Sequence, residues 1–248
     1  MARDSARISV SFSTKERLLD SAEELFAQHG IHTASMRDIT GHAGTNIASV
    51  NYHFGSKEGL LEAIFERRIK PVNEERMRLF DIAEQHFAPN CPPIDALLYA
   101  LMAPAMRCIS NSPSFARLAG RVQTDPNDEL RERVILSQFK ELAARAFPLF
   151  QKALPHLTME ELWWRMHFIV GSMTYTWTNY RDIDIFTKNV VNHPSVQQLT
   201  KRLIHAAKTT LLAPPTSEEK LEFGGLERVY MLPDASLPEL LGESLANV

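Results

Sequence analysis

The stretch from Ser35 to Lys57, SMRDITGHAGTNIASVNYHFGSK, constrains the fold of this chain more than any other. Apolar side chains at Met36, Ile39 and Ala43 recur at helical spacing, behind a serine and an aspartate spaced as a capping box. Gly44 then offers the positive φ that commonly ends a helix. The sequence therefore predicts a short helix followed by a tight turn.

A second short helix follows that turn. Thr45 and Asn46 offer side-chain oxygens that can cap a helix running roughly from Ile47 to Phe54. Only Val50 and Phe54 form an apolar pair four residues apart, and the other side chains of this helix are mostly polar or small. A helix of about two turns is marginal alone, so its neighbours must hold it with the polar side exposed. This pattern indicates a helix-turn-helix, whose second helix enters the DNA major groove.

The same stretch carries a family resemblance. Ala43-Gly44 and the later run NYHFGSKEGLL, from Asn51 to Leu61, closely resemble the signature of the TetR/AcrR family of bacterial transcriptional regulators. The amphipathic helix that precedes this signature in the family corresponds to Lys15 to Gln28. The resemblance implies an all-α fold, with an N-terminal three-helix helix-turn-helix DNA-binding domain and a C-terminal helical ligand-binding and dimerisation domain.

We therefore expect three parts along the chain. Residues 1–55 form the helix-turn-helix domain, with a loose arm at 1–12, and residues 56–212 form the helical effector-binding and dimerisation domain. Residues 213–248 contain prolines, glycines and an excess of acidic residues. This composition is typical of a tail that lies on the body of the protein or is disordered.

A fourth helix, capped by Ser56, is expected to join the two domains. Pro71 lies inside it, and because an interior proline removes a hydrogen bond at a cost of about 3 kcal/mol, we expect a kink near Lys70. The proline is either simple punctuation between domains or a bend through which motion passes. Both interpretations remain open.

Beyond a linker at residues 88–93, APNCPP, the remaining apolar patterns are helical, and no strand-like alternation of useful length is visible. Pro148 suggests a further kink in the longest of these segments. The predicted helices are Ile94–Ile109, Pro113–Val122, Asn127–Leu154, Met159–Thr178 and Val196–Leu212.

Charge limits how such a chain binds DNA. The 27 Lys and Arg residues and 30 Asp and Glu residues give a net charge of −3, and residues 1–70 carry nine of each sign. Because a basic surface supplies most non-specific affinity, we expect modest non-specific binding and reliance on placed contacts.

The resemblance assigns these contacts residue by residue. Phosphate contacts fall on Ser35, Arg37, Tyr52, His53 and Lys57, and base-reading positions fall on Thr45, Asn46, Ile47, Ala48, Ser49 and Asn51. An asparagine can pair with the adenine edge, and Ile47 or Ala48 can meet a thymine methyl group. Many family members have tyrosine at position 51, so Asn51 either reads a base or reaches only a phosphate. Ser49 can instead simply permit close approach, and His53 can stack at the helix junction.

The segment Met159–Thr178 is apolar nearly all round. Such a helix must be buried on more than one side, against its own core and a second copy of the chain. We therefore expect a homodimer that forms an isologous four-helix interface through the last two long helices and binds a palindromic operator in double-stranded DNA. The alternative is a central core helix in a monomer.

The run LWWRMHF, from Leu162 to Phe168, resembles a helix in the branch of the family that senses fatty acids or their thioesters. A pocket for such a ligand needs apolar walls and a few polar groups at one end. Candidates are Phe115, Arg121, Gln123, Phe139, Phe147, Phe150, Arg165, Met166, His167, Tyr175 and Trp177. Each aromatic residue can equally belong to the core, Arg165 can pair with Glu161, and His167 can be structural.

No metal and no cofactor is expected. Cys91 and Cys108 have no ligand partners at useful spacing, and no catalytic or phosphate-binding motif is visible. No signal peptide precedes residue 30 and no uncharged apolar run reaches bilayer length, so we expect a protein of the bacterial cytoplasm with no membrane partner.

The sequence favours a dimeric repressor that a small apolar effector, either a fatty acid, an acyl thioester or a xenobiotic, releases from its operator. Repressor and activator remain open, because the outcome depends on where the operator lies. The alternatives are a ligand-independent helical DNA-binding or interaction module, and a helical enzyme.

Overall fold

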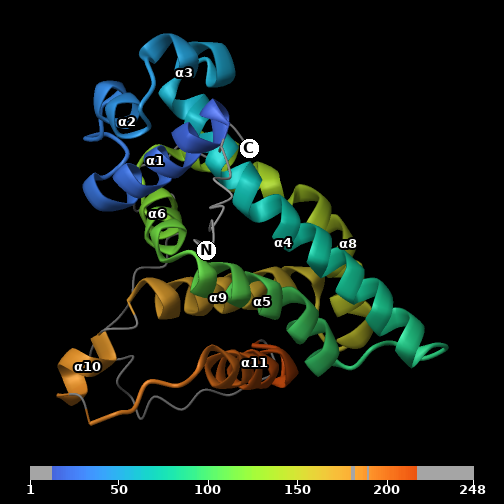
Figure 1. Ribbon diagram of the computed structural model, residues 1–248. Helices are drawn as coiled ribbons and strands as arrows, with labels where there is room; N and C mark the ends of the chain where they lie inside the picture. The colour runs from blue at the N-terminus through green and yellow to red at the C-terminus, as the bar shows by residue number, and fades with distance from the viewer. Residues whose placement is uncertain (1–12, 180–181, 189, 217–248) are drawn as a thin grey trace, which may run out of the picture. The chain divides into compact units, whose positions relative to one another are not determined.

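The computed structural model describes residues 13–179, 182–188 and 190–216 (Figure 1). All regular elements within these ranges are helices, which confirms the all-α prediction. The chain separates into two compact units, Met1–Ala213 and Pro214–Val248. The predicted arm at 1–12 and most of the predicted tail lie outside the described residues.

Three helices form the amino-terminal region: α1 (Thr14–His29), α2 (Met36–His42) and α3 (Ile47–Phe54). Each begins at a side-chain cap that the sequence contains, and the residues capping them are Ser13, Ser35 and Asn46. Gly44 adopts a φ of 61° in the turn between α2 and α3, a conformation that costs a residue with a Cβ atom. The predicted helix-turn-helix and the bounds of α3 therefore agree with the structure.

Helix α4 (Lys57–Phe87) is 31 residues long and continues through Pro71 without interruption. The proline removes a single N–H donor, and buried residues on both sides of it, Ile69 and Arg76 among them, anchor the helix. The helix that was expected to resume after Pro71 is therefore continuous with the segment before it, and the kink near Lys70 remains a prediction.

The remaining helices follow the linker at residues 88–93. They are α5 (Ile94–Asn111), α6 (Pro113–Gln123), α7 (Asp128–Val134), the 3-10 helix η1 (Leu136–Phe139), α8 (Lys140–Ala153), α9 (Met159–Thr178), α10 (Asp182–Thr187) and α11 (Val196–Leu212). Helices α5, α6, α9 and α11 match their predicted ranges closely, whereas α10 was not predicted.

The prediction of one helix from Asn127 to Leu154 is wrong, because α7, η1 and α8 occupy this range. The Asn73 side chain of α4 donates a hydrogen bond of 2.6 Å to the carbonyl of Gln138. A continuous α-helix would use that carbonyl for the N–H four residues later. The interruption at η1 thus coincides with a contact between residues far apart in sequence. The local spacing of apolar residues does not reveal such a contact.

Two hydrophobic cores share helix α4. The first joins α1–α3 and the start of α4 to buried residues of α6 and α7, including Phe115, Leu118 and Leu130. The second joins Phe80 of α4 to α5, α8, α9 and α11. Helix α6 contacts both α1 and α9 (Figure 1). The first core therefore extends past residue 55, and the domain boundary expected there remains a prediction.

Candidate nucleic-acid interface

Helix α3 is held by one buried side chain and otherwise presents its surface to solvent. Val50 is fully buried and Phe54 is half-buried against the first core. The side chains of Ile47, Asn51 and Tyr52 are exposed, Tyr52 by 85%. In Figure 1, α3 lies at the periphery of the amino-terminal helices, beside α2 and the start of α4. The helix thus exposes its polar side to solvent, as the sequence predicts.

The side chain of Asn46 fixes the start of α3. Its Oδ1 atom accepts a hydrogen bond of 3.0 Å from the backbone N–H of Ser49 and one of 3.2 Å from the Ser49 hydroxyl. Thr45, half-buried, donates its hydroxyl to the Asn46 carbonyl. Because the cap occupies Oδ1, the side-chain amide of Asn46 offers a binding partner mainly its N–H donors. Ala48 is exposed beside it, at the first turn of α3.

The predicted phosphate contacts near α2 are both exposed, but their chemistry differs. Arg37 presents a guanidinium group at the first turn of α2. Ser35 is engaged with Asp38, to which its hydroxyl donates a hydrogen bond of 2.6 Å. Side-chain and backbone hydrogen bonds from Ser35 lower the pKa of the Asp38 carboxyl group. A carboxylate at this position repels phosphate, so Arg37 is the better placed of the two contacts.

Lys57 is folded back against the amino-terminal core. Its Nζ atom lies 3.4 Å from the carbonyl of His32 and 5.8 Å from the centre of the Phe26 ring. At the start of α4 its charge is combined with free N–H groups and the positive end of the helix dipole. A phosphate bound there would compete with the His32 carbonyl for the ammonium group.

Tyr52 and His53 lie together at the carboxyl end of α3. Their rings meet edge to face with centres 5.0 Å apart, and the His53 ring lies 5.9 Å from that of Phe54. Both side chains are exposed. The structure therefore shows His53 as part of an aromatic group at the helix junction while leaving it accessible to a phosphate.

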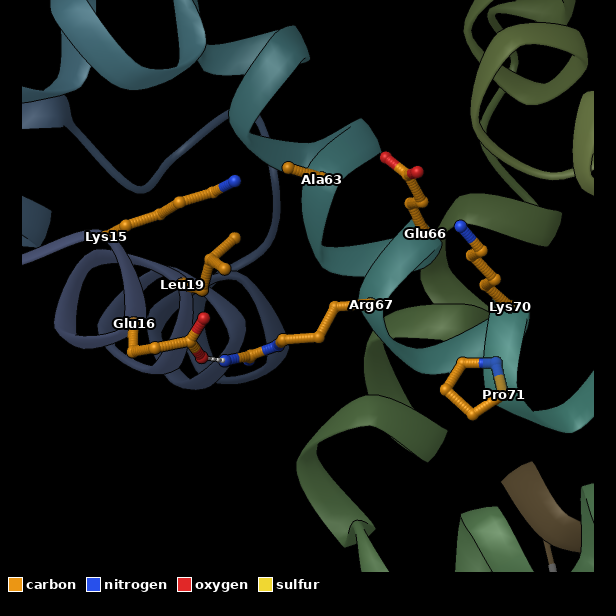
Figure 2. Close-up of a pocket in the computed structure, with 8 residues that line it drawn as sticks. All are labelled: Lys15, Glu16, Leu19, Ala63, Glu66, Arg67, Lys70 and Pro71. Carbon is orange, nitrogen blue, oxygen red and sulfur yellow. Dashed lines mark hydrogen bonds and ion pairs between the residues drawn. The ribbon is translucent and has the colours of Figure 1, made fainter. Parts of the chain in front are cut away.

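An ion-pair cluster, which the sequence analysis did not anticipate, ties α1 to α4. The Glu23 side chain is 4% exposed and accepts hydrogen bonds of 2.8 to 3.1 Å from Arg67 and Arg68. Arg67 also donates a hydrogen bond of 3.0 Å to Glu16 (Figure 2) and one of 2.8 Å to Asp20. The only sequence signal was a row of acidic residues on α1 at spacings of four and three, opposite two consecutive arginines.

A second set of polar contacts ties the amino-terminal helices to α6. Arg121 donates to the carbonyls of Ala27 and Gln28 at the end of α1, so this predicted ligand residue holds a helix end. The His32 ring lies 2.9 Å from the buried Asp125 carboxylate. Burial alone would raise the pKa of Asp125, but the N–H of Asn127 and the His32 ring outweigh it and lower that pKa.

The predicted aromatic wall is divided between the two cores. Phe115 packs against Phe65 in the first core, with ring centres 5.2 Å apart. Phe150 and Met166 are buried in the second core, while Phe139 is half-buried and borders both. Phe147 stacks on Trp163. These residues are therefore packed against helices and against one another rather than gathered around one space.

The predicted polar end is divided in the same way. Arg165 is buried, pairs with Glu161, and donates to the carbonyls of Thr210, Leu211 and Ala213 at the end of α11. Its pairing with Glu161 is the alternative that the sequence left open.

The other polar candidates lie on the surface or at its edge. His167 and Gln123 are exposed, and Tyr175 donates its hydroxyl to Asp182 at 2.8 Å. Trp177 is half-buried, and its indole N–H has no hydrogen-bond partner in the part of the chain that the structure describes. None of the predicted ligand residues lines the cleft between α1 and α4 or the groove between α4, α5 and α11.

Arg76 is a further buried arginine that sequence reasoning missed. It is 4% exposed, and its Nε atom donates a hydrogen bond of 2.7 Å to the Leu101 carbonyl, in the turn of α5 that precedes Pro104. Pro104 has no N–H to donate to the carbonyl of Ala100, four residues earlier, and Leu101 directly follows that residue. Burial lowers the pKa of Arg76 to about 10. The residue thus ties α4 to a weak point of α5.

The face of α9 that points away from the second core is rich in aromatic side chains. Trp163, Trp164, Phe168 and Tyr175 are each exposed by more than half. The opposite face is buried and includes Leu162 and Ile169. Exposed apolar patches of this kind mark interaction surfaces.

Two findings concern other classes of site, within the described residues only. No helix there is long and apolar enough to cross a membrane. No group of three or more His, Cys, Asp or Glu side chains is placed to hold a metal ion.

Comparisons with known proteins agree with this geometry. Residues 18–64 match the family described as "Bacterial regulatory proteins, tetR family", and residues 99–208 match "Tetracyclin repressor-like, C-terminal domain". The regulator UidR of Escherichia coli K12 is 39% identical over 51 residues, 21% of this chain and 26% of UidR. The dual regulator CecR of Shigella flexneri is 37% identical over 73 residues, 27% of this chain and 32% of CecR. These matches span about a quarter to a third of each relative.

Solved structures share the fold over most of the chain. The fatty acid degradation regulator FadR from Bacillus halodurans aligns with a TM-score of 0.60 at 16% identity, covering 82% of this chain and 96% of that one. FadR from Bacillus subtilis, solved in complex with stearoyl-CoA, aligns with a TM-score of 0.59 at 16% identity, covering 77% and 96%. Since the amino-terminal and carboxyl-terminal parts of the chain match domains of one family in the order that the fold requires, this protein belongs to the TetR family of DNA-binding transcription regulators.

Proposed function

We propose that this TetR-family regulator acts in the bacterial cytoplasm as a homodimeric repressor, which binds a palindromic operator until an acyl effector releases it. The observation that supports the proposal most is the exposure of α3. Val50 is buried, whereas the polar and small side chains of the helix are mostly exposed. A helix presented in this way can enter the major groove without unfolding any part of the core.

The proposed base contacts come from the exposed face of α3 and its cap. Asn51 and the Asn46 amide supply hydrogen bonds to base edges, and Ile47 supplies an apolar contact to a thymine methyl group. Arg37, Tyr52 and Lys57 are the proposed phosphate contacts. Phosphate contacts set the register of the helix and base contacts set the sequence preference.

The proposed dimer is built from the aromatic face of α9, together with α11 beside it. Helix α9 packs on α11 within one protomer, so two copies joined at these helices form the four-helix arrangement that the sequence suggested. The two α3 helices of such a dimer, which we call the reading helices, would then face the two halves of one palindrome. Their separation would be one DNA turn, about 34–36 Å, or a multiple of it.

The proposed effector class rests on the chain's likeness to two FadR proteins. One is described as a fatty acid degradation regulator, and the other was solved in complex with stearoyl-CoA. Helices α4 and α6 supply a physical path, because both contribute to the first core and also contact helices of the second. An effector that favours another arrangement of the second core would thereby change the separation of the two α3 helices by population shift.

A ligand-independent regulator is the second candidate. The observation that favours it is the close packing of the predicted pocket residues, in which Phe115 contacts Phe65 and Arg165 holds the end of α11. A regulator without an effector would be controlled by its own abundance alone.

Mapping the bound sites on the chromosome of the source organism tests the proposed function. The proposal predicts a shared palindromic motif, and purified protein that binds this motif as two chains per site. Saturating acyl compounds should then raise the melting temperature of the protein and release the DNA. Bound sites without a palindrome would contradict the dimeric operator complex, and absence of any acyl effect would favour the ligand-independent candidate.

A further inference from the structure

A groove of about 320 Å³ lies between α4, α5 and the start of α11. Its apolar side is lined by Leu79 of α4, Tyr99, Ala103, Pro104 and Met106 of α5, and Val196 of α11. Its volume falls at the small end of the range for ligand sites, roughly 300–1,000 Å³. None of these residues belongs to the pocket that the sequence predicted.

Small residues on α5 explain why a groove forms here. Ala103 and Pro104 have short side chains and line the groove together with the longer side chains of Leu79 and Met106. Tyr99, one turn before Ala103, is 56% exposed and forms a wall. The space is therefore bounded by apolar surface on three helices.

Two cations at the same groove have no ion-pair partner among the described residues. Arg107 of α5 and Lys201 of α11 line the groove, and within residues 13–179, 182–188 and 190–216 no carboxylate lies within ion-pair distance of either. The acidic residue nearby, Glu75, accepts two hydrogen bonds of 2.8 Å from Arg78. Arg107 also interacts electrostatically with Glu75. Because the two hydrogen bonds from Arg78 offset that carboxylate, Arg107 and Lys201 together leave the groove with an excess of positive charge.

The cleft between α1 and α4 lacks this combination of an apolar lining and an excess of positive charge. It has a similar volume, about 310 Å³, but lies between α1 and α4 and is lined by charges of both signs (Figure 2). Arg67 in that cleft is already paired with Glu16 and Asp20. That cleft therefore favours neither an apolar chain nor an anion, whereas the α4–α5–α11 groove favours both.

We propose that the α4–α5–α11 groove binds an amphipathic anion, namely a medium-length acyl chain with an anionic head. The chain lies along Leu79, Tyr99 and Met106, and the head pairs with Arg107 and Lys201. A carboxylate and the phosphates of an acyl thioester share this chemistry. The proposal rests on the proposed function and deepens it, because it gives the effector a charge and a site.

The groove also has a direct connection to the DNA-binding helices. Leu79 belongs to α4, and the same continuous helix begins at Lys57, next to α3. A ligand that bridges Leu79 and Val196 would fix the spacing between α4 and α11. Because α11 is part of the proposed dimer interface, a changed spacing between α4 and α11 would alter the separation of the two α3 helices.

Calorimetry on the full-length protein tests the site without DNA. The probes are decanoate, decan-1-ol and decylamine, which share a chain and differ in head charge, together with decanoyl-CoA. The variants are Arg107→Gln/Lys201→Gln and a matched control, Lys140→Gln/Lys152→Gln, which removes two exposed charges from α8. Ala103→Trp fills the groove without changing charge, and circular dichroism checks that each variant folds.

The proposal predicts that decanoate binds more tightly than the alcohol and the amine. Affinity should fall about tenfold or more in Arg107→Gln/Lys201→Gln, because hydrogen bonds between charged groups are the stronger ones, and remain unchanged in the control. Ala103→Trp should weaken binding of decanoate and decanol alike. A preference for decanoyl-CoA over decanoate identifies the thioester as the source of the anion, and the reverse identifies the free acid.

Equal affinity for the acid and the alcohol, or equal losses in the groove and control variants, would overturn the proposal. Operator release is measured separately, so the two hypotheses fail in different ways. If decanoate releases DNA equally from wild type and Arg107→Gln/Lys201→Gln, the groove is wrong and the proposed function stands. If decanoate binds through Arg107 and Lys201 and leaves operator affinity unchanged, the groove stands and the proposed effector class is wrong.

Discussion

Helices α3 and α9 both expose a face to solvent, and the two faces differ in chemistry. On α3 the exposed residues are mainly polar or small, and the helix is secured by a side-chain cap and by Val50. On α9 the exposed residues include two tryptophans and a phenylalanine, and the buried residues are apolar except for Arg165. The polar face suits base edges and phosphates, whereas the aromatic face suits a second protein surface.

The largest expected effect comes from placing charge on the α9 face. Trp164→Asp/Phe168→Asp should convert the proposed dimer to a monomer, because an unpaired carboxylate cannot be buried at low cost in an interface. Operator affinity should fall about a hundredfold or more, since the two half-sites lose their link. Sedimentation and fluorescence anisotropy measure the two effects.

Ile82→Asp, on an exposed apolar position of α4, is the matched control for this test. It should leave both the oligomeric state and the operator affinity unchanged. A Trp164→Asp/Phe168→Asp protein that remains a dimer with full affinity would show that the α9 face is not the interface.

The next effect concerns how α3 is supported. Glu23→Gln removes the buried carboxylate between Arg67 and Arg68 while keeping its shape, and should lower the free energy of unfolding by about 2 kcal/mol. Breaking a buried pair costs roughly 3–5 kcal/mol, and the partial exposure of both arginines reduces that figure. Urea denaturation measures the change.

Glu24→Gln, one residue along and exposed on α1, is the control for Glu23→Gln. It should change the free energy of unfolding by less than about 0.5 kcal/mol, as is usual for surface substitutions. Equal losses of unfolding free energy in the two variants would show that the ion-pair cluster does not stabilise the amino-terminal helices.

A smaller effect separates phosphate contact from base contact. Lys57→Ala should weaken binding to operator and to scrambled DNA by the same factor, and should reduce the salt dependence of log affinity by about one unit. Titrations at several salt concentrations measure both quantities. An unchanged salt slope would mean that Lys57 stays with the His32 carbonyl when DNA binds.

The smallest effect is a pH dependence at the contact between His32 and Asp125. The pKa of Asp125 is lowered in the folded protein, so its contribution to stability is present above the unfolded pKa, about 3.9, and is lost as the pH falls through the folded value. Asp125→Asn should therefore flatten the loss of stability below about pH 4. Thermal melts from pH 3 to pH 7, with the exposed Glu129→Gln as control, test this, and identical slopes would contradict it.

Short-range signals explain why the fold was largely predictable. The cap at Asn46, the positive φ at Gly44 and the apolar pair Val50 and Phe54 lie within a few residues of one another, and the structure shows all of them. Features of this kind depend on residues that are neighbours in the sequence, so they can be predicted from it. The bounds of α3 and the all-α class follow from it.

The roles of the arginines were not predictable for the opposite reason. Arg76, Arg121 and Arg165 each donate to backbone carbonyls far away in the chain. Every residue carries a carbonyl, so such an acceptor leaves no mark in the sequence. Two of these arginines were expected at a ligand, and the structure shows them joining helices instead.

The most direct test of the central claim compares operator and scrambled DNA for wild type and for Ile47→Ala/Asn51→Ala. The account predicts that wild type prefers the operator by about a thousandfold or more. The variant should lose at least about tenfold of affinity for the operator and almost none for scrambled DNA. Equal losses on both DNAs, or an unchanged preference, would contradict the claim that α3 reads the sequence.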